Sequence, residues 1–178
     1  MSTPADRIVE LHRSLTGAGI DHAFGGALAL AWCTGRARGT LDIDMNVFLP
    51  VDRVDELVRA LPEAMFVSDD EHLTLQRDGQ CRLWYGSLPV DVFLSTTPFH
   101  GWANGRVRHE QFNGESIPFL SCSDLAIFKA FFDRPKDWED LEEMLLVGTL
   151  DLAAVAKTLF EFLPSDDPRL EKLRQLNR

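Results

Sequence analysis

Residues 24–47 read FGGALALAWCTGRARGTLDIDMNV, and this stretch decides which fold we expect. The glycine pair Gly25–Gly26 opens a short apolar run that predicts a helix over residues 27–33. A basic, glycine-punctuated turn follows, and residues 41–49 then predict a strand. The stretch therefore predicts a glycine turn, a helix and a strand in close succession.

Two carboxylates lie on that predicted strand, Asp42 and Asp44. Residues two apart on a strand point to the same face, so both side chains are expected to project together. Like charges side by side repel unless a cation lies between them, and Mg²⁺ prefers carboxylate and phosphate oxygens. The backbone of Gly25–Gly26 can approach a polyphosphate closely, and the helix after it would direct its N-terminal amides at that anion.

The pattern of Gly25–Gly26, a helix, and Asp42-Ile43-Asp44 resembles the polymerase-beta-like nucleotidyltransferase superfamily. Within it, the chain looks most like the AbiEii/MenT type of toxin nucleotidyltransferase, and later segments match as well. The resemblance implies an α+β fold, with a mixed, mostly antiparallel sheet flanked by helices and further helices at the C-terminus.

A third acidic residue, Asp91, stands at the centre of the apolar segment 88–94, LPVDVFL. A carboxylate in an apolar strand is costly to bury unless it is paired or bound to a metal. We therefore expect Asp91 to complete a metal site with Asp42 and Asp44, although an edge-strand residue facing solvent is the simpler alternative. Such a triad suits two-metal nucleotidyl transfer, in which Asp91 bridges the ions or acts as general base to the acceptor hydroxyl.

The segment 124–137, DLAIFKAFFDRPKD, resembles a later motif of the family. By that match Lys129 binds the triphosphate and Asp137 supports the site. Alternatively, the aliphatic stem of Lys129 packs along its apolar neighbours and its ammonium reaches water. Asp151 resembles the final acidic position of the toxin families and could equally be a helix N-cap.

The turn before the acidic strand carries Arg38 and Thr40. Arg38 is placed to hold a triphosphate oxygen, and Thr40 to hydrogen-bond the nucleotide. Toxin relatives carry Ser or Thr at this place, which implies that Thr40 can be phosphorylated and the site thereby blocked.

The 178 residues carry a formal net charge of −10, which excludes nucleic-acid binding through a global positive field. Contact with RNA would need a local basic face, and each basic residue is more simply explained as a solvated partner of the many acids. The candidates for such a face are Arg36, Arg38, Arg77, Arg82, Arg106, Arg108, Arg134 and Lys136.

The remaining composition predicts a cytoplasmic protein without a membrane segment, since no apolar run is long enough to span a bilayer. Cys33, Cys81 and Cys122 are odd in number and widely spaced, which favours reduced, mostly buried thiols. The five histidines lack metal-ligand spacing, so zinc chemistry is not expected.

The chain is expected to form a nucleotidyltransferase core over residues 1–120 and a helical part over residues 121–178, packed as one compact unit. Helices are predicted at 5–15, 52–61, 121–145, 151–163 and 168–176, and strands at 21–24, 65–67, 72–77, 81–85, 88–94, 106–111 and 116–120, with hairpin turns at 78–79 and 113–114.

The expected function is Mg²⁺-dependent transfer of a nucleotide from a nucleoside triphosphate to an acceptor hydroxyl. The toxin resemblance implies a tRNA 3′ end as acceptor and a cognate antitoxin as partner. Two alternatives remain open: a small-molecule nucleotidyltransferase of the antibiotic-modifying kind, and a binding module that kept the fold without the chemistry.

Overall fold

The computed structural model describes residues 3–37, 39–40 and 42–176. The chain divides into two units. We call Met1–Leu28 with Arg38–Leu120 the sheet unit, and Ala29–Ala37 with Ser121–Arg178 the helical unit. The sequence-based division put residues 29–37 with the first part.

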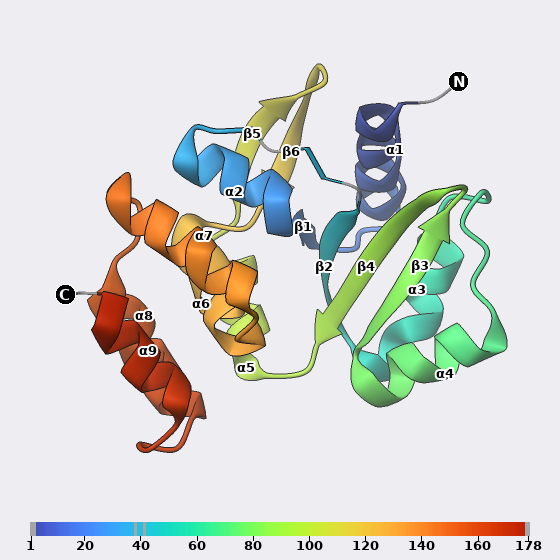
Figure 1. Cartoon of the computed structure of the whole chain (residues 1–178). Coiled ribbons are helices and arrows are strands. Elements are labelled where there is room, and N and C mark those ends of the chain that lie inside the picture. The colour runs from blue at the N-terminus through green and yellow to red at the C-terminus, as the bar shows by residue number, and fades with distance from the viewer. Residues whose placement is uncertain (1–2, 38, 41, 177–178) are drawn as a thin grey trace. The chain divides into compact units, whose positions relative to one another are not determined.

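The sheet unit contains a mixed sheet with the strand order β3-β4-β2-β1-β6-β5 (Figure 1). β2 runs parallel to β4 and β1 runs parallel to β6, while the other neighbours are antiparallel. The expected α+β fold with a mixed sheet is confirmed. The strands are β1 (His22–Phe24), β2 (Ile43–Pro50), β3 (Gln80–Tyr85), β4 (Leu88–Ser95), β5 (Arg108–Phe112) and β6 (Glu115–Phe119).

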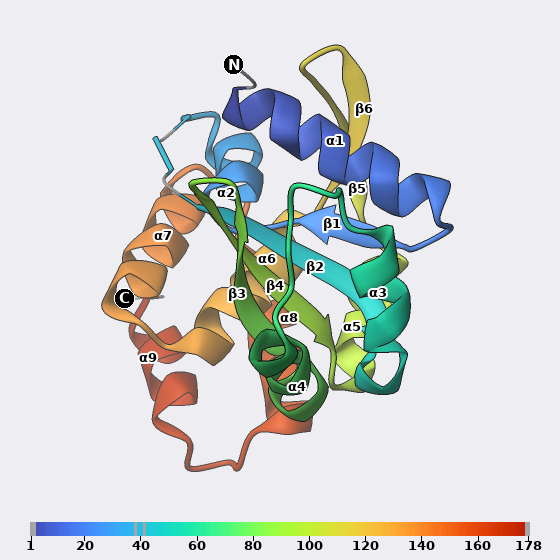
Figure 2. The same cartoon turned by 90° about the vertical axis from the view of Figure 1, so that its right-hand side faces the viewer.

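Helices α1 (Pro4–Gly17), α3 (Val54–Ala60) and α4 (Asp69–Asp78) lie on the same side of this sheet (Figure 2). Period-2 alternation on β2 and β4 directs every second residue to the helices and buries it. The resulting core consists of Ile43, Met45, Val47, Leu49, Val90, Val92 and Leu94 from the strands, with Ile8, Leu11, Leu15, Leu57 and Leu75 from the helices. The intervening positions of β2 and β4 face the other way and carry the predicted acidic residues.

Helix α4 replaces the strand predicted at 72–77, and residues 65–67 precede it without forming a strand, so both expectations were wrong. Ser68 and Glu71 form a capping box at the start of this helix, in which the Glu71 carboxylate accepts a hydrogen bond from the Ser68 amide at 2.8 Å. Gly79 ends the helix in the left-handed region at φ 69°, so the predicted hairpin turn at 78–79 is a helix C-cap.

The helical unit contains the helices predicted after residue 120, together with the larger part of α2 (Gly26–Thr34). These are α6 (Cys122–Phe132), α7 (Pro135–Leu146), α8 (Leu152–Phe162) and α9 (Pro168–Leu176). Asp151 is the N-cap of α8 and accepts a hydrogen bond from the Ala154 amide at 3.0 Å. In the described part of the chain, none of the helices has the length and apolar character needed to cross a membrane.

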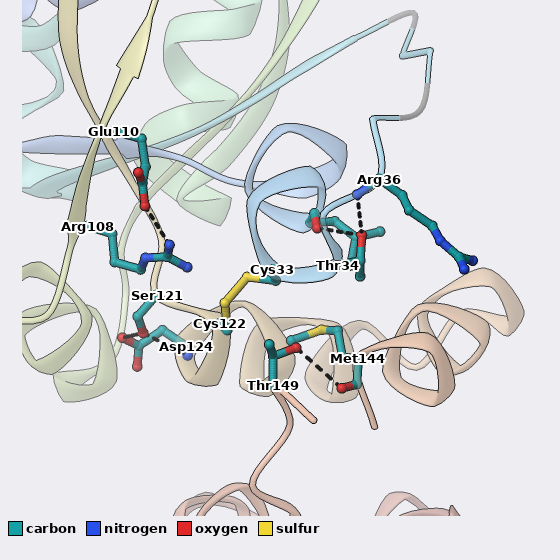
Figure 3. Close-up of a disulfide and its surroundings, with 11 residues drawn as sticks. Cys33, Thr34, Arg36, Arg108, Glu110, Ser121, Cys122, Asp124, Met144 and Thr149 are labelled. Carbon is teal, nitrogen blue, oxygen red and sulfur yellow. Dashed lines mark hydrogen bonds and ion pairs between the residues drawn. A yellow bond between two sulfur atoms is a disulfide. The ribbon is translucent and has the colours of Figure 1, made fainter. Parts of the chain in front are cut away.

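A disulfide joins Cys33 of α2 to Cys122 at the start of α6, with their Cα atoms 5.6 Å apart (Figure 3). The expectation of reduced thiols at these two positions was therefore wrong. The 89-residue separation hid the pairing, since the first cysteine lies before most of the sheet unit and the second after it. Cys81 remains a free thiol.

Candidate active site

Three charged residues form a row across three neighbouring strands of the sheet unit. Arg82 of β3 is the register partner of Asp91 of β4, and Asp91 is in turn the register partner of Asp44 of β2. Register partners point to the same face of a sheet, so the row lies on the face opposite the helix-covered core. The parallel pairing of β2 and β4 thus places Asp44 beside Asp91.

Asp42 lies one residue before β2, because this strand begins at Ile43. The predicted start of the strand, residue 41, lies outside the described residues. Its carboxylate is fixed by Thr40, whose hydroxyl donates to Asp42 Oδ1 at 2.9 Å and lies 3.0 Å from the Asp42 carbonyl oxygen. Thr40 therefore orients a candidate metal ligand. The predicted contact of Thr40 with a nucleotide stays a prediction.

The guanidinium of Arg82 connects two of the acidic residues. Its Nε and Nη2 donate to the two carboxylate oxygens of Asp91, each at 2.7 Å, and Nη2 also reaches Asp42 Oδ2 at 3.2 Å. The hydrogen bonds to Asp91, and then the negative charges of Asp91 and Asp42, hold the pKa of the Arg82 guanidinium above its ordinary value. A cation thus lies between carboxylates that would otherwise repel each other.

The glycine pair is packed against Asp44. The Gly25 amide donates to the Asp44 carbonyl at 2.9 Å. Gly26 has a φ of 51°, and a Cβ added there would lie 1.7 Å from Asp44 Oδ2. Gly26 therefore makes room for the carboxylate at the start of α2. The predicted approach of this backbone to a polyphosphate stays a prediction.

The chemistry of these donors fits a hard divalent cation. Asp42, Asp44 and Asp91 supply carboxylate oxygens, the ligands that Mg²⁺ prefers, and the guanidinium of Arg82 already acts as the cation for two of them. In the described residues, no three His, Cys, Asp or Glu side chains are arranged as a set of metal ligands. The assignment of the metal to this triad stays a prediction.

Lys129 lies in a buried ion-pair network of the helical unit. Its Nζ is 2.7 Å from Asp140 Oδ2 and 3.5 Å from Asp137 Oδ1, and its side chain is only 7% exposed. Arg134 Nε donates to Asp137 Oδ2 at 2.6 Å. Asp137 and Asp140 thus pair with Lys129 and Arg134, and Asp140 is a member of the network that the sequence analysis missed. The predicted role of Lys129 in phosphate binding stays a prediction.

Arg38 lies outside the described residues, and its predicted contact with the triphosphate is therefore untested. Arg82 was considered only as one of several surface arginines. A local signal could have found it, because Gly86 and Ser87 are the only residues between β3 and β4. A two-residue hairpin turn fixes the register, and that register places Arg82 opposite Asp91.

A second polar cluster of the sheet unit involves His12 of α1 and His22 of β1, whose nitrogens Nδ1 and Nε2 are 3.0 Å apart. His22 Nδ1 donates to the Ile20 carbonyl at 2.9 Å, so its bare Nε2 accepts from His12. Burial lowers the pKa of His22 to about 4 and also lowers that of His12. The pair lines a cavity of about 450 Å³ that is separate from the carboxylates.

Comparison with protein families gives one match, which covers residues 23–172 and is described as "Nucleotidyltransferase of unknown function (DUF6036)". Comparison with curated proteins found no match.

Similar folds occur among solved structures of low sequence identity. A solution structure of the antibiotic-resistance factor ANT(2″)-Ia is 16% identical, covers 100% of this chain and 93% of its own, and has a TM-score of 0.56. A crystal structure of ANT(2″)-Ia in complex with adenylyl-2″-tobramycin is 14% identical, covers 98% of both chains and has a TM-score of 0.55. An antigenic nucleotidyltransferase-like protein from Paracoccidioides brasiliensis is 15% identical, covers 94% of this chain and 90% of its own, and has a TM-score of 0.53. These likenesses support the fold, and the match over residues 23–172 shows that the chain belongs to the DUF6036 family of nucleotidyltransferases.

Proposed function

We propose that the protein transfers a nucleotide from a nucleoside triphosphate to an acceptor hydroxyl, with Mg²⁺ held by Asp42, Asp44 and Asp91. The observation that carries the proposal is the convergence of the Asp42 and Asp91 carboxylates on one cationic group, beside the register partner Asp44. Carboxylates gathered at one place favour a bound cation, because a cation offsets their mutual repulsion.

The roles of the residues follow from their positions. Bound Mg²⁺ would lower the pKa of the acceptor hydroxyl and hold the triphosphate, so that the hydroxyl attacks the α-phosphorus in line and pyrophosphate leaves. Thr40 keeps the Asp42 carboxylate oriented through its hydrogen bond to Oδ1. Asp91 is the candidate general base. The start of α2 at Gly26 would face the phosphates, since the Gly25 amide already donates to the Asp44 carbonyl.

For the acceptor, the resemblance to AbiEii/MenT-type toxins supports a tRNA 3′ end, with a cognate antitoxin as partner. On this reading, phosphorylation of Thr40 would inactivate the protein. A phosphate on that hydroxyl would break its hydrogen bond to Asp42 and add negative charge beside a carboxylate. Intact-mass measurement of protein co-expressed with the antitoxin should show one added phosphate that Thr40→Val abolishes. An unmodified Thr40 would contradict this mode of control.

A second acceptor class, small cationic molecules, is favoured by the net charge of −10. An acidic protein attracts a polycation and repels the tRNA backbone over distances up to the Debye length. The similar fold of ANT(2″)-Ia, solved with adenylyl-2″-tobramycin, supports the same class.

The experiment incubates the protein with each α-labelled triphosphate, Mg²⁺, and either total tRNA or a panel of aminoglycosides. Asp42→Ala and Asp91→Asn test the site, and Asp70→Asn on the exposed start of α4 is the matched control. We expect label on an acceptor with the wild type and Asp70→Asn, and a loss of about a hundredfold or more with the site variants. Label on tRNA would support the toxin reading, and label on an aminoglycoside the small-molecule reading. Absence of transfer to every acceptor, with no Mg²⁺-dependent nucleotide binding, would leave a binding module.

A further inference from the structure

The contacts of Arg82 occupy the oxygens that a metal ion would need. Both carboxylate oxygens of Asp91 accept hydrogen bonds from the guanidinium. At Asp42, Oδ2 accepts from Arg82 and Oδ1 accepts from Thr40. All four oxygens of these two carboxylates are thus engaged, three of the hydrogen bonds coming from one arginine. Each of these oxygens keeps a second lone pair, but a divalent cation bound there would lie beside the positive guanidinium, so the two cations compete for the same negative charge.

We propose that Arg82 is a built-in competitor of the metal ion, which holds Asp42 and Asp91 together in the metal-free protein and is displaced when the divalent cation binds. The inference rests on the proposed function, since it assigns regulation to the same carboxylate site. Arg82 is thus a positioning residue that sets the metal concentration at which the site fills.

The surroundings of Arg82 allow this displacement. β3 is an edge strand of the sheet, and the side chain of Arg82 is 50% exposed. A half-exposed arginine–carboxylate pair contributes little free energy, because water and salt screen it. The guanidinium can therefore exchange the two carboxylates for solvent by rotation of its side chain, without any change in the strand.

Removing the guanidinium should accordingly increase the affinity of the site for a divalent cation. A Gln at position 82 keeps much of the length of the side chain and removes its charge, so Asp42 and Asp91 face the metal without the guanidinium between them. A Lys at position 82 keeps the charge but cannot engage both oxygens of Asp91 in a fork. Its metal affinity should lie between those of the wild type and Arg82→Gln.

The test is a titration with Mn²⁺ alone, without nucleotide, followed by the electron paramagnetic resonance signal of the free ion. The single variants are Arg82→Gln, Arg82→Lys and Asp44→Asn, and the double variant combines Arg82→Gln with Asp44→Asn. Arg53→Gln is the matched control, since Arg53 forms a similar fork with Glu56 at 2.6 and 2.7 Å and is 51% exposed. Far-UV circular dichroism checks that each variant is folded.

We expect Arg82→Gln to bind Mn²⁺ about three- to tenfold more tightly than the wild type, with Arg53→Gln unchanged. Asp44→Asn should remove most of this binding in both backgrounds. If Arg82→Gln binds Mn²⁺ no more tightly while Asp44→Asn still removes the binding, the competition is refuted and the proposed metal site survives. Binding that is absent from every variant, or insensitive to Asp44→Asn, would overturn the metal site itself and this inference with it.

Discussion

The carboxylate of Asp44 fills the space that any side chain at Gly26 would need. Gly26 has a positive φ, and the position of an added Cβ lies 1.7 Å from Asp44 Oδ2 and 2.5 Å from Asp44 Cγ. Gly26→Ala must therefore strain the backbone and push Asp44 away from its register partner Asp91. We expect a loss of about 2–4 kcal/mol in the free energy of unfolding, measured with urea, and loss of nucleotide transfer.

Two glycines provide controls for this prediction. A Cβ at Gly101 in α5 (Pro98–Asn104) meets no atom within 4 Å, so Gly101→Ala should leave both quantities almost unchanged. A Cβ at Gly25 would meet only side-chain atoms at 3.0 Å or more, and Gly25→Ala should give an intermediate loss. Equal effects of Gly25→Ala and Gly26→Ala would contradict the packing argument.

Substitution of Lys129 tests whether its main role is structural. Lys129→Met removes the ammonium that the buried carboxylates of Asp137 and Asp140 share, while Arg134 still pairs with Asp137. We expect a loss of about 3 kcal/mol in the free energy of unfolding, because removing one partner of a buried ion pair is costly. Urea titration measures this loss.

The double variant Lys129→Met with Asp140→Asn should recover part of that stability, since it also removes the negative charge of the carboxylate that paired with Lys129. A rise in the KM for the triphosphate without any loss of stability would instead restore phosphate binding as the role of Lys129.

The low pKa of His22 predicts an acid-sensitive fold. Because His22 has a pKa of about 4 in the folded protein and an ordinary value of 6.5 in the unfolded chain, the unfolded chain binds a proton first as the pH falls. The contribution of neutral His22 is complete above pH 6.5 and is lost between pH 6.5 and 4, to a total of about 3 kcal/mol. His12 shifts in the same direction.

Urea unfolding at pH 7.5, 6 and 5 measures this loss. His22→Gln, which does not titrate, should show a shallower pH dependence than the wild type. His72→Gln in α4 provides the control on a histidine that does not line this cavity. Parallel pH dependences of the wild type and His22→Gln would contradict the assignment.

The disulfide between Cys33 and Cys122 predicts a difference between oxidised and reduced protein. A thiol titration in denaturant, which exposes the buried Cys33, should count one thiol, Cys81, before reduction and three after it. Because the bond closes a long loop in the unfolded chain, its reduction should lower the free energy of unfolding by about 2–4 kcal/mol. Cys33→Ser should reproduce this loss, and Cys81→Ser should leave the loss on reduction unchanged. Three reactive thiols in protein not treated with a reductant would refute the disulfide.

Local patterns predicted most of the elements that build the site. The strand with Asp91 and the helices after Ser121 were found because their apolar periodicity and caps are contained in a few residues. α4 was mistaken for strands because Leu73 and Leu75 alternate with polar residues, whereas the capping signal of Ser68 and Glu71 was overlooked. The short helix α5 was not predicted either.

Relationships between distant residues were the harder part. Two of these contacts depend on how the helices pack, which their order in the sequence does not specify. They are the disulfide between Cys33 and Cys122 and the buried ion pair of Lys129 with Asp140. The bridge from Arg82 to Asp42 spans 40 residues and requires β4 to lie between β3 and β2. Such a contact follows from strand order, which no local pattern in the chain specifies.

The Cys33–Cys122 bond closes a covalent loop that contains residues 38–120, the larger part of the sheet unit. A protease that cuts this loop once, for example beside the exposed Phe66, produces two fragments, and each fragment carries one of the bonded cysteines. The two pieces would migrate as a single species on a denaturing gel until a reductant is added. The bond therefore acts as a retaining tether, so that a nick in the segment bearing Asp42 and Asp91 leaves its two halves covalently attached and able to reassociate.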